Sequence, residues 1–219
     1  MKNQKLNVQI VEMNLLLKPC SFKIAKYAVL HWHYSKAMPS GKLVKYGVWE
    51  DNEYIGCVIY GRGANNKMPK SLGLKVTQCC ELVRVALKDH KMPTSKIVAI
   101  SLRLLHKDNP GILKVFSYAD ETNQKHKGII YKASNWKYEG IRTTGKGAYY
   151  LINGKIIHGR SARAKYGSQS KFPKGWKDVE PMKKHLFTYT FKYADLAQGS
   201  AVGFQSTDGS QTDQSAQNL

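Results

Sequence analysis

Residues 79–120, CCELVRVALKDHKMPTSKIVAISLRLLHKDNPGILKVFSYAD, predict a strand, a helix and a second strand in that order. The runs CCELVRVAL and ILKVFSYAD are apolar and rich in β-branched residues, which is typical of buried strands. Between them, apolar residues recur at helical spacing after Pro93, and Asn109-Pro110-Gly111 ends the helix. Two strands joined by a crossover helix lie parallel in one sheet, so this stretch predicts an α/β fold.

Further strands are predicted on both sides of this unit. Before it, Ser21 caps a helix from Phe22 to His33, and KLVKYGVWE and YIGCVIYGRG form a hairpin around Asp51-Asn52. After it come a short helix in KGIIYKASN, the segment WKYEG, a hairpin at Asn153-Gly154 and the alternating strand HLFTYTFKY. We expect one mixed central β-sheet with flanking helices and a C-terminal hairpin and strand extension.

Three segments lack a periodic pattern. GANNKMPKSLG predicts a polar loop, and RSARAKYGSQSKFPKGWK predicts an extended basic loop. From Gln198 onward the composition is dominated by Gly, Ser, Gln, Asn and Thr, which cannot bury enough apolar surface to become ordered. We therefore expect a single domain over residues 1–197 and a disordered polar tail over residues 198–219.

The charge of the chain indicates a polyanionic partner. The 219 residues carry 35 Lys and Arg against 15 Asp and Glu, a net charge of +20. Residues 198–219 hold two of the acids and no Lys or Arg, so residues 1–197 carry +22. Such an excess repels itself within a compact fold, and a nucleic acid or an anionic membrane surface would relieve the repulsion. The alternative is a basic surface that only keeps the protein soluble.

The sequence disfavours a membrane protein and an exported one. No stretch approaches the about 18 apolar residues of a membrane helix, and residues 8–17, the best N-terminal candidate, contain Gln9, Glu12 and Asn14. The four cysteines form no CxxC pair, which favours reduced, core-filling thiols in a cytoplasmic protein. A homodimer stays open.

Polar side chains lie within the first predicted parallel strand and at the end of the second. Glu81 and Arg84 lie in the first strand, and Ser117, Tyr118 and Asp120 end the second. Ligands of open α/β sheets bind beyond the carboxyl ends of the strands, where a carboxylate can act as a general base and an Arg can hold a phosphate. A structural Glu–Arg pair and an Asp that caps the next helix explain the same pattern.

Two further segments carry candidate residues. Tyr131, on the short helix, has a phenol that can donate a proton to a leaving thiolate, although a helical Tyr is more often part of the core. HWHYSK contains His31, His33 and Tyr34. Histidines two residues apart do not share a helix face, so they are weak metal candidates.

Five sequence blocks, in one order over residues 31–193, resemble a known family. They are HYSKAMPSGKLVKYGVWE, IGCVIYGRGANN, CCELVRVAL, SYADETNQKHKGIIYKASNWKYEG and NGKIIHGRSARAKYG. Together they resemble the Mom family of bacteriophage DNA-modification proteins. The resemblance implies an acyl-CoA N-acyltransferase (GNAT) fold. It also implies a phage enzyme that converts adenine in double-stranded DNA to its N6-carbamoylmethyl (methylcarbamoyl) form in the host cytoplasm, protecting the DNA from restriction.

The same resemblance implies roles for particular residues. Tyr131 in YKASNW matches the Tyr-x-x-x-x-aromatic pattern whose Tyr is the usual acid for the CoA thiolate. The residues that match the family's other core motifs are Arg84, Ser117, Tyr118 and Asp120, with His33 and Tyr34 in its HYSK block.

The implied cofactor is an acyl-CoA such as acetyl-CoA. The usual acyltransferase pyrophosphate loop, Gln/Arg-x-x-Gly-x-Gly/Ala, is absent, and KDHKMPT occupies its place at 88–94. Backbone amides at the helix N-terminus can still hold a phosphate. The residues expected there are Thr94, Ser95 and Lys96, with Lys88 and Lys91 helping.

The implied product needs more than plain acyl transfer. Acyl transfer attaches a carbonyl carbon, whereas carbamoylmethylation attaches a methylene carbon. A glycine-derived donor, or a metal ion near His33, Tyr34 or Asp120, could supply the difference. Adenine N6 is a poor nucleophile that needs a base or a polarising group. It also lies inside the duplex, so we expect the base to be flipped out and stacked on an aromatic ring.

Residues 160–177 are the expected DNA contact. Lys and Arg would hold phosphates, and aromatic side chains such as Phe172 would wedge or stack. The candidates are Arg160, Arg163, Lys165, Tyr166, Lys171, Lys174 and Trp176. Two alternatives remain. The first is an N-acetyltransferase that acts on a protein or a small amine, which would leave the positive charge unexplained. The second is a non-catalytic DNA-binding factor, but no helix-turn-helix or zinc-finger pattern supports it.

Overall fold

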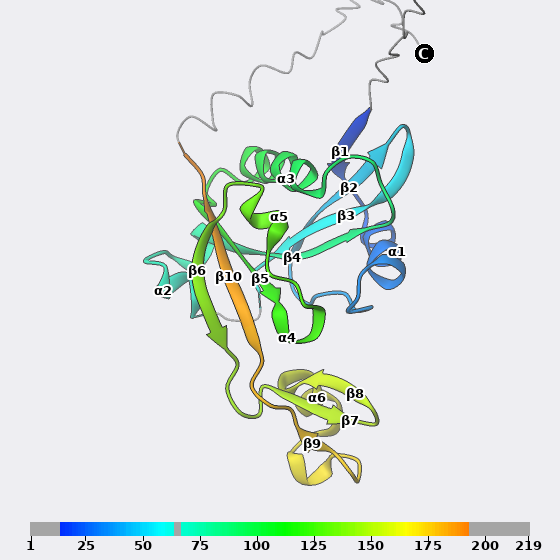
Figure 1. Ribbon diagram of the computed structural model, residues 1–219, viewed down its shortest axis with the longest axis vertical. Coiled ribbons are helices and arrows are strands. Elements are labelled where there is room, and N and C mark those ends of the chain that lie inside the picture. The colour runs from blue at the N-terminus through cyan, green and yellow to red at the C-terminus, as the bar shows by residue number, and fades with distance from the viewer. Residues whose placement is uncertain (1–13, 64–66, 193–219) are drawn as a thin grey trace, which may run out of the picture.

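The computed structural model describes residues 14–63 and 67–192, and it contains two β-sheets (Figure 1). The large sheet has the strand order β1-β2-β3-β4-β5-β10-β6, and the small sheet has the order β8-β7-β9. The strands are β1 (Leu15–Pro19), β2 (Leu43–Glu50), β3 (Glu53–Gly61), β4 (Cys79–Leu87), β5 (Lys114–Asp120), β6 (Lys137–Thr143), β7 (Tyr149–Ile152), β8 (Lys155–His158), β9 (Lys177–Asp178) and β10 (Lys183–Thr190). The helices are α1 (Phe22–Trp32), α2 (Met68–Ser71), α3 (Thr94–Asp108), α4 (Glu121–Gln124), α5 (Ile129–Lys132) and α6 (Gly159–Tyr166), with 3₁₀ turns at Val76–Gln78 and Gln169–Lys171.

The strand–helix–strand unit is confirmed. Strands β4 and β5 pair in parallel and are joined by α3, whereas every other described pair in the large sheet is antiparallel. The β2–β3 hairpin is also confirmed: Asp51 and Asn52 have φ of 50° and 67°, as a tight two-residue hairpin turn requires. The β7–β8 hairpin turns at Asn153 and Gly154 in the same way. The expected mixed sheet with flanking helices is therefore present.

The helices cover both faces of the large sheet, so alternate strand residues meet different partners (Figure 1). Val58 and Tyr60 pack in the main core with α3 and α5, while Cys57 and Ile59 pack under α1. Cys79 and Cys80 lie in different clusters because neighbouring strand residues point to opposite faces, and all four cysteines are free thiols, as predicted.

Helix α1 packs on the sheet through small side chains. Ile24 and Tyr27 are 39% and 51% exposed, and the helix buries Ala25, Ala28 and Val29 instead. Small residues let the helix lie close to the sheet, and the larger apolar side chains therefore face outward. The cap is confirmed, because the Ser21 hydroxyl accepts a hydrogen bond from the Ile24 amide at 3.3 Å.

Two predicted loops contain helices. Helix α2 lies within residues 63–73, and the basic segment at 160–177 begins with α6 rather than extended chain. His158 caps α6, and Ala162 and Tyr166 pack on the small sheet. Because only Ala162 and Tyr166 of α6 pack in this cluster, the apolar pattern of the helix is too short to be recognised among its polar residues. Tyr193 and the predicted tail at 198–219 lie outside the described residues.

The small sheet has its own aromatic core beyond the lower ends of β6 and β10 (Figure 1). Tyr150, Ile152, Ala162 and Phe172 are buried together. The strand β10 returns from this unit and inserts between β5 and β6, so it is an interior strand rather than an added edge. No helix in the described part of the chain is long and apolar enough to cross a bilayer.

Candidate active site

The parallel strands separate soon after they pair. The β4–β5 ladder has three residue pairs and ends at Glu81 and Phe116. The β3–β4 register also shifts between Leu82 and Arg84, which bends β4. Beyond the ladder, the Ser117 hydroxyl donates to the Leu82 carbonyl oxygen at 2.8 Å. An opening at the carboxyl end of parallel strands is the usual ligand position in such sheets.

Tyr131 lies at this opening. Its hydroxyl is 2.9 Å from the Ser117 hydroxyl, and its ring centroid is 5.0 Å from that of Phe187. Gly128 begins α5 with a φ of 79°, and a Cβ there would lie 2.2 Å from the Phe187 ring, so glycine is needed at this position. Burial raises the pKa of Tyr131 to about 12, against the opposing effect of the Ser117 hydrogen bond. The phenol therefore holds its proton at neutral pH.

The residues of SYAD do not share one face, which corrects the expectation of a single cluster. Ala119 packs in the main core beside α3. Tyr118 packs with Phe116 in a separate cluster that includes Met68 of α2. Strand alternation therefore places Ser117 on the Tyr131 side and Asp120 on the opposite side. Both side chains follow the point at which the two strands separate.

Asp120 has a basic cross-strand neighbour. Lys184 pairs directly with Asp120 in the antiparallel β5–β10 ladder, so the two side chains share a face. The Lys184 ammonium donates to the Tyr149 hydroxyl at 2.8 Å and lies 5.0 Å from the centre of that ring. The side chains of Asp120, Lys184 and Tyr149 therefore lie next to one another in that order where the large sheet meets the small one.

Arg84 holds the loop that follows α1. Its Nε and Nη2 donate to the Ala37 carbonyl oxygen at 3.3 and 3.2 Å, and Nη1 donates to the Val83 carbonyl oxygen at 2.6 Å. Burial lowers the pKa of Arg84, and nearby Tyr34, Glu81 and Tyr149 act in the opposite direction. Arg84 is therefore positioned by backbone carbonyls rather than by a simple pair with Glu81.

Tyr34 brings the HYSK block to the same place. Its side chain is 59% exposed, and its ring centroid is 4.2 Å from that of His33. Partial burial raises the pKa of Tyr34, and ionisable groups nearby also act on it. Those groups are Arg84, Asp120, Lys184 and Tyr149.

His33 forms hydrogen bonds within the loop that follows α1. Its Nδ1 lies 2.8 Å from the Ser35 hydroxyl and accepts from the Ser35 amide at 3.0 Å. Within residues 14–63 and 67–192, no group of three or more His, Cys, Asp or Glu side chains is placed to hold a metal ion. The structure therefore gives the proposed metal near His33, Tyr34 or Asp120 no support.

The buried His33 imidazole leads us to expect that the folded protein loses stability at acidic pH. Burial lowers its pKa to about 3, and Arg84 and Lys36 lower it further in the same direction. The unfolded chain, with a pKa of 6.5, takes up the proton more readily, so stability falls as the pH drops from about 6.5 toward 3. At pH 5 we expect a loss of about 2 kcal/mol. Urea unfolding at pH 7.5 and 5 should show this loss in the wild type and a smaller one in His33→Asn; equal losses would contradict the assignment.

Three of the cofactor candidates, Lys88, Lys91 and Thr94, make contacts around the loop before α3. The ammonium groups of Lys88 and Lys91 pair with carboxylates of the β2–β3 hairpin. The backbone amides of Lys91 and Met92 donate to the buried Glu50 carboxylate at 2.9 and 2.7 Å. Thr94 hydrogen-bonds to His90 at 3.0 Å. The loop before α3 is thus organised by acidic side chains.

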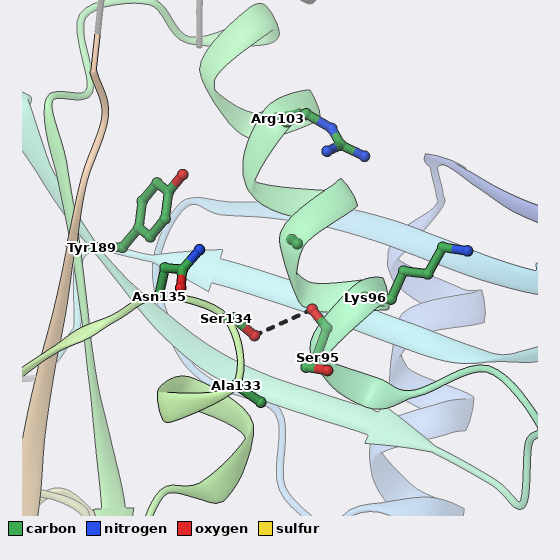
Figure 2. A pocket seen from close by; sticks show the side chains of 8 residues that line it. Ser95, Lys96, Arg103, Ala133, Ser134, Asn135 and Tyr189 are labelled. Carbon is green, nitrogen blue, oxygen red and sulfur yellow. Dashed lines mark hydrogen bonds between the residues drawn. The ribbon is translucent and has the colours of Figure 1, made fainter. Parts of the chain in front are cut away.

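Ser95 and Lys96 line a cavity of about 330 Å³ between α3 and the turn after α5 (Figure 2). Across it, the Ser134 hydroxyl donates to the Ser95 carbonyl oxygen at 3.2 Å. Lys96 and Arg103 extend from the same side of α3 (Figure 2). The cavity lining is Ser95, Lys96, Ala99, Arg103, Ala133, Ser134, Asn135 and Tyr189. Two cations and several polar groups suit an anionic ligand.

The basic and aromatic DNA candidates behave differently. The exposed ones are Arg160, Arg163, Lys165, Lys171 and Lys174. Phe172 is only 7% exposed, and Tyr166 and Trp176 pack edge-on against it. Phe172 is therefore part of the core of the small sheet rather than an exposed ring, whereas Tyr166 and Trp176 are partly exposed and their contact with DNA stays a prediction. Arg163 also donates to the buried Tyr150 hydroxyl at 3.3 Å.

Sequence reasoning missed two groups of polar residues. Lys184 and Tyr149 become neighbours of Asp120 through the pairing of β5 with β10. No local sequence motif predicts that pairing. On the other side of β10, His185 bridges Glu121 at 2.9 Å and the Tyr138 hydroxyl at 2.8 Å, and so ties α4 and β6 to the strand.

Comparisons with known proteins return one family model and several similar solved structures. A model of the Mom protein family matches residues 14–201. No curated protein matches the sequence. An N-acetyltransferase from Staphylococcus aureus is a similar solved structure, with 13% identity, a TM-score of 0.48, and coverage of 81% of this chain and 97% of that one.

Two other solved structures are similar at the same level. A probable acetyltransferase from Staphylococcus epidermidis has 10% identity and a TM-score of 0.48, covering 82% of this chain and 100% of that one. A Bacillus subtilis acetyltransferase in complex with CoA has 11% identity and a TM-score of 0.45, covering 83% and 100%.

Proposed function

The chain belongs to the Mom protein family, and from that premise we propose that it is a phage transferase that converts adenine in DNA to N6-carbamoylmethyladenine. The modification would protect phage DNA from restriction in the host cytoplasm. One observation carries the proposal: Tyr131 on one side and Asp120 with Arg84 on the other flank a single opening between β4 and β5. A proton donor and a carboxylate on opposite sides of one opening suit group transfer to an amine.

An acyl-CoA is the proposed cofactor, and the residues on the α3 side fit it. The cavity beside Ser95, with Lys96 and Arg103, offers cations for its phosphates. When bound, the cofactor would supply an activated acyl group and a thiolate leaving group. Because plain acyl transfer attaches a carbonyl carbon, the methylene carbon that bonds to N6 would have to come from a further, glycine-derived donor. The Tyr131 hydroxyl would hold a proton at the opening, ready for such a leaving group.

The adenine is proposed to enter from the Asp120 side. Its amino group donates its lone pair into the ring, so a base is needed to remove a proton as the new bond forms. Asp120 is the carboxylate placed for this, and Arg84 and Lys184 would stabilise negative charge that develops nearby. The small sheet borders this side through Tyr149.

DNA is proposed to bind on the small sheet. Residues 144–182 carry eight Lys and Arg against two acids, and all eight basic residues are exposed. Duplex affinity should therefore fall steeply with salt, by about 0.9 log unit per log unit of salt for each phosphate neutralised. A salt-independent affinity, or none at low salt, would remove this part of the proposal.

Changing three exposed lysines to glutamine locates the DNA surface. With Lys165, Lys171 and Lys174 replaced together, the slope of log affinity against log salt should decrease by about 2.7. The matched control replaces Lys70, Lys75 and Lys107, which are equally exposed but lie outside the small sheet. Equal changes in the two triple variants, measured by fluorescence anisotropy, would show that the small sheet is not the DNA surface.

Mass spectrometry of nucleosides tests the reaction itself. DNA from cells that express the protein should contain adenosine carrying a carbamoylmethyl group, and DNA from cells without it should not. Unmodified adenosine together with acetylated lysine or small amines would instead support the N-acetyltransferase alternative.

A further inference from the structure

We propose that Tyr149 is a base-stacking residue, and that its ring and the ring of Tyr34 hold the extruded adenine between them above Asp120. This inference rests on the proposed action on DNA and deepens it. It assigns a role to a residue that the sequence did not single out, and it links the basic small sheet to the reacting group.

The position of Tyr149 is fixed by contacts from two elements. It is the first residue of β7 and is half-buried. The Lys184 ammonium holds its hydroxyl at 2.8 Å, and the His158 ring lies edge-on to it with centroids 5.1 Å apart. Since Lys184 is the direct cross-strand neighbour of Asp120, the Tyr149 hydroxyl is one side chain away from that carboxylate.

Tyr34 comes from a different part of the chain, and Asp120, Lys184 and Tyr149 lie close enough to act electrostatically on its hydroxyl. It follows α1 in a loop that Arg84 fastens through the Ala37 carbonyl oxygen. Its ring is supported by His33 and is otherwise largely exposed. An exposed ring supported from behind leaves one aromatic face for a ligand.

The rings suit a purine because stacking needs only flat π surfaces. Stacking of a base on an aromatic side chain tolerates any base, so selection of adenine would come from polar groups at its edge. Asp120 can accept a hydrogen bond from an amino group. A base extruded from duplex DNA on the small sheet would meet Tyr149 first, since that ring lies where the two sheets join.

A competing explanation is that Tyr149 only anchors the small sheet through Lys184. The two roles depend on different atoms: stacking needs the ring, and anchoring needs the hydroxyl. Tyr149→Phe removes the hydroxyl and keeps the ring, while Tyr149→Leu removes both. Tyr138 provides a matched control, because it is also a partly exposed tyrosine whose hydroxyl bonds to a β10 residue, His185, on the other face of that strand.

The test compares affinity for two duplex oligonucleotides, one fully paired and one with a single unpaired adenine. The full chain should prefer the unpaired adenine, since extrusion then costs less. Tyr149→Leu should reduce affinity for that probe by about 10-fold with little effect on the paired duplex, and Tyr149→Phe and Tyr138→Leu should bind like the wild type.

Each other outcome is decisive. Equal losses in Tyr149→Phe and Tyr149→Leu would overturn stacking in favour of anchoring, and wild-type binding by Tyr149→Leu would overturn any role of this ring. Tyr149→Trp should keep the preference and guards against misfolding of the leucine variant; loss of the preference there would also count against stacking. A wild-type protein that binds neither duplex would overturn the proposed function instead.

Discussion

Asp120→Asn is expected to reduce adenine modification by about 10³-fold while DNA binding and folding stay close to those of the wild type. Asparagine keeps the shape of the side chain but cannot accept a proton from the adenine amino group. It can still accept hydrogen bonds through its amide oxygen. The measurement is the fraction of modified adenosine in digested DNA after exposure to equal amounts of each protein.

A charge-matched control separates catalysis from binding. Asp89→Asn makes the same change in net charge at an exposed position in the loop before α3. Both variants should bind DNA slightly more tightly because each loses one negative charge, but only Asp120→Asn should lose modification. Full activity in Asp120→Asn would show that another group accepts the proton.

The parts of the fold that the sequence predicts are those with local signals. The β4–α3–β5 unit has long apolar runs, a helical period and clear breakers, and it is present as expected. Asp51 and Asn52 predicted their hairpin because few other residues adopt a positive φ in two consecutive positions. Such features depend on a few neighbouring residues.

The missed features depend on tertiary contacts. Helix α6 is marked only by Ala162 and Tyr166, whose partners on β7 and after α6 lie elsewhere in the chain. The aromatic side chains near Phe172 look like a nucleic-acid surface in sequence, but they are the apolar residues available to build the core of the small sheet. In a short, basic segment the same rings fit both interpretations.

The candidate site shows the same division. Motifs identify Ser117 and Tyr131, which are in contact at the opening, and Arg84, which lies on β4 close to it. Motifs do not identify Lys184 and Tyr149, since their place depends on the register of a strand that begins more than sixty residues after β5 ends. Register follows from the packing of whole faces, which a single sequence does not display.

Tyr131→Phe is expected to lower the rate of modification by about 10²-fold, the effect of removing a proton donor, without unfolding the protein. The phenylalanine ring keeps its contacts with Phe187 and Trp136. Ser117 keeps its bond to the Leu82 carbonyl oxygen, so no buried polar group is left unpaired. The stability cost should therefore stay near 1 kcal/mol, measurable by urea unfolding.

The chain contains a closely matched control for this change. The Tyr60 hydroxyl is also buried and lies 2.6 Å from a serine hydroxyl, that of Ser101, which also donates to a backbone carbonyl oxygen. Tyr60→Phe therefore makes the same chemical change in the same sheet, but on β3, the strand on the far side of β4 from the opening. Similar stability losses with a rate loss in Tyr131→Phe alone would assign the proton to the reaction. Equal rates in both variants would show that Tyr131 is a core residue and that the leaving group obtains its proton elsewhere.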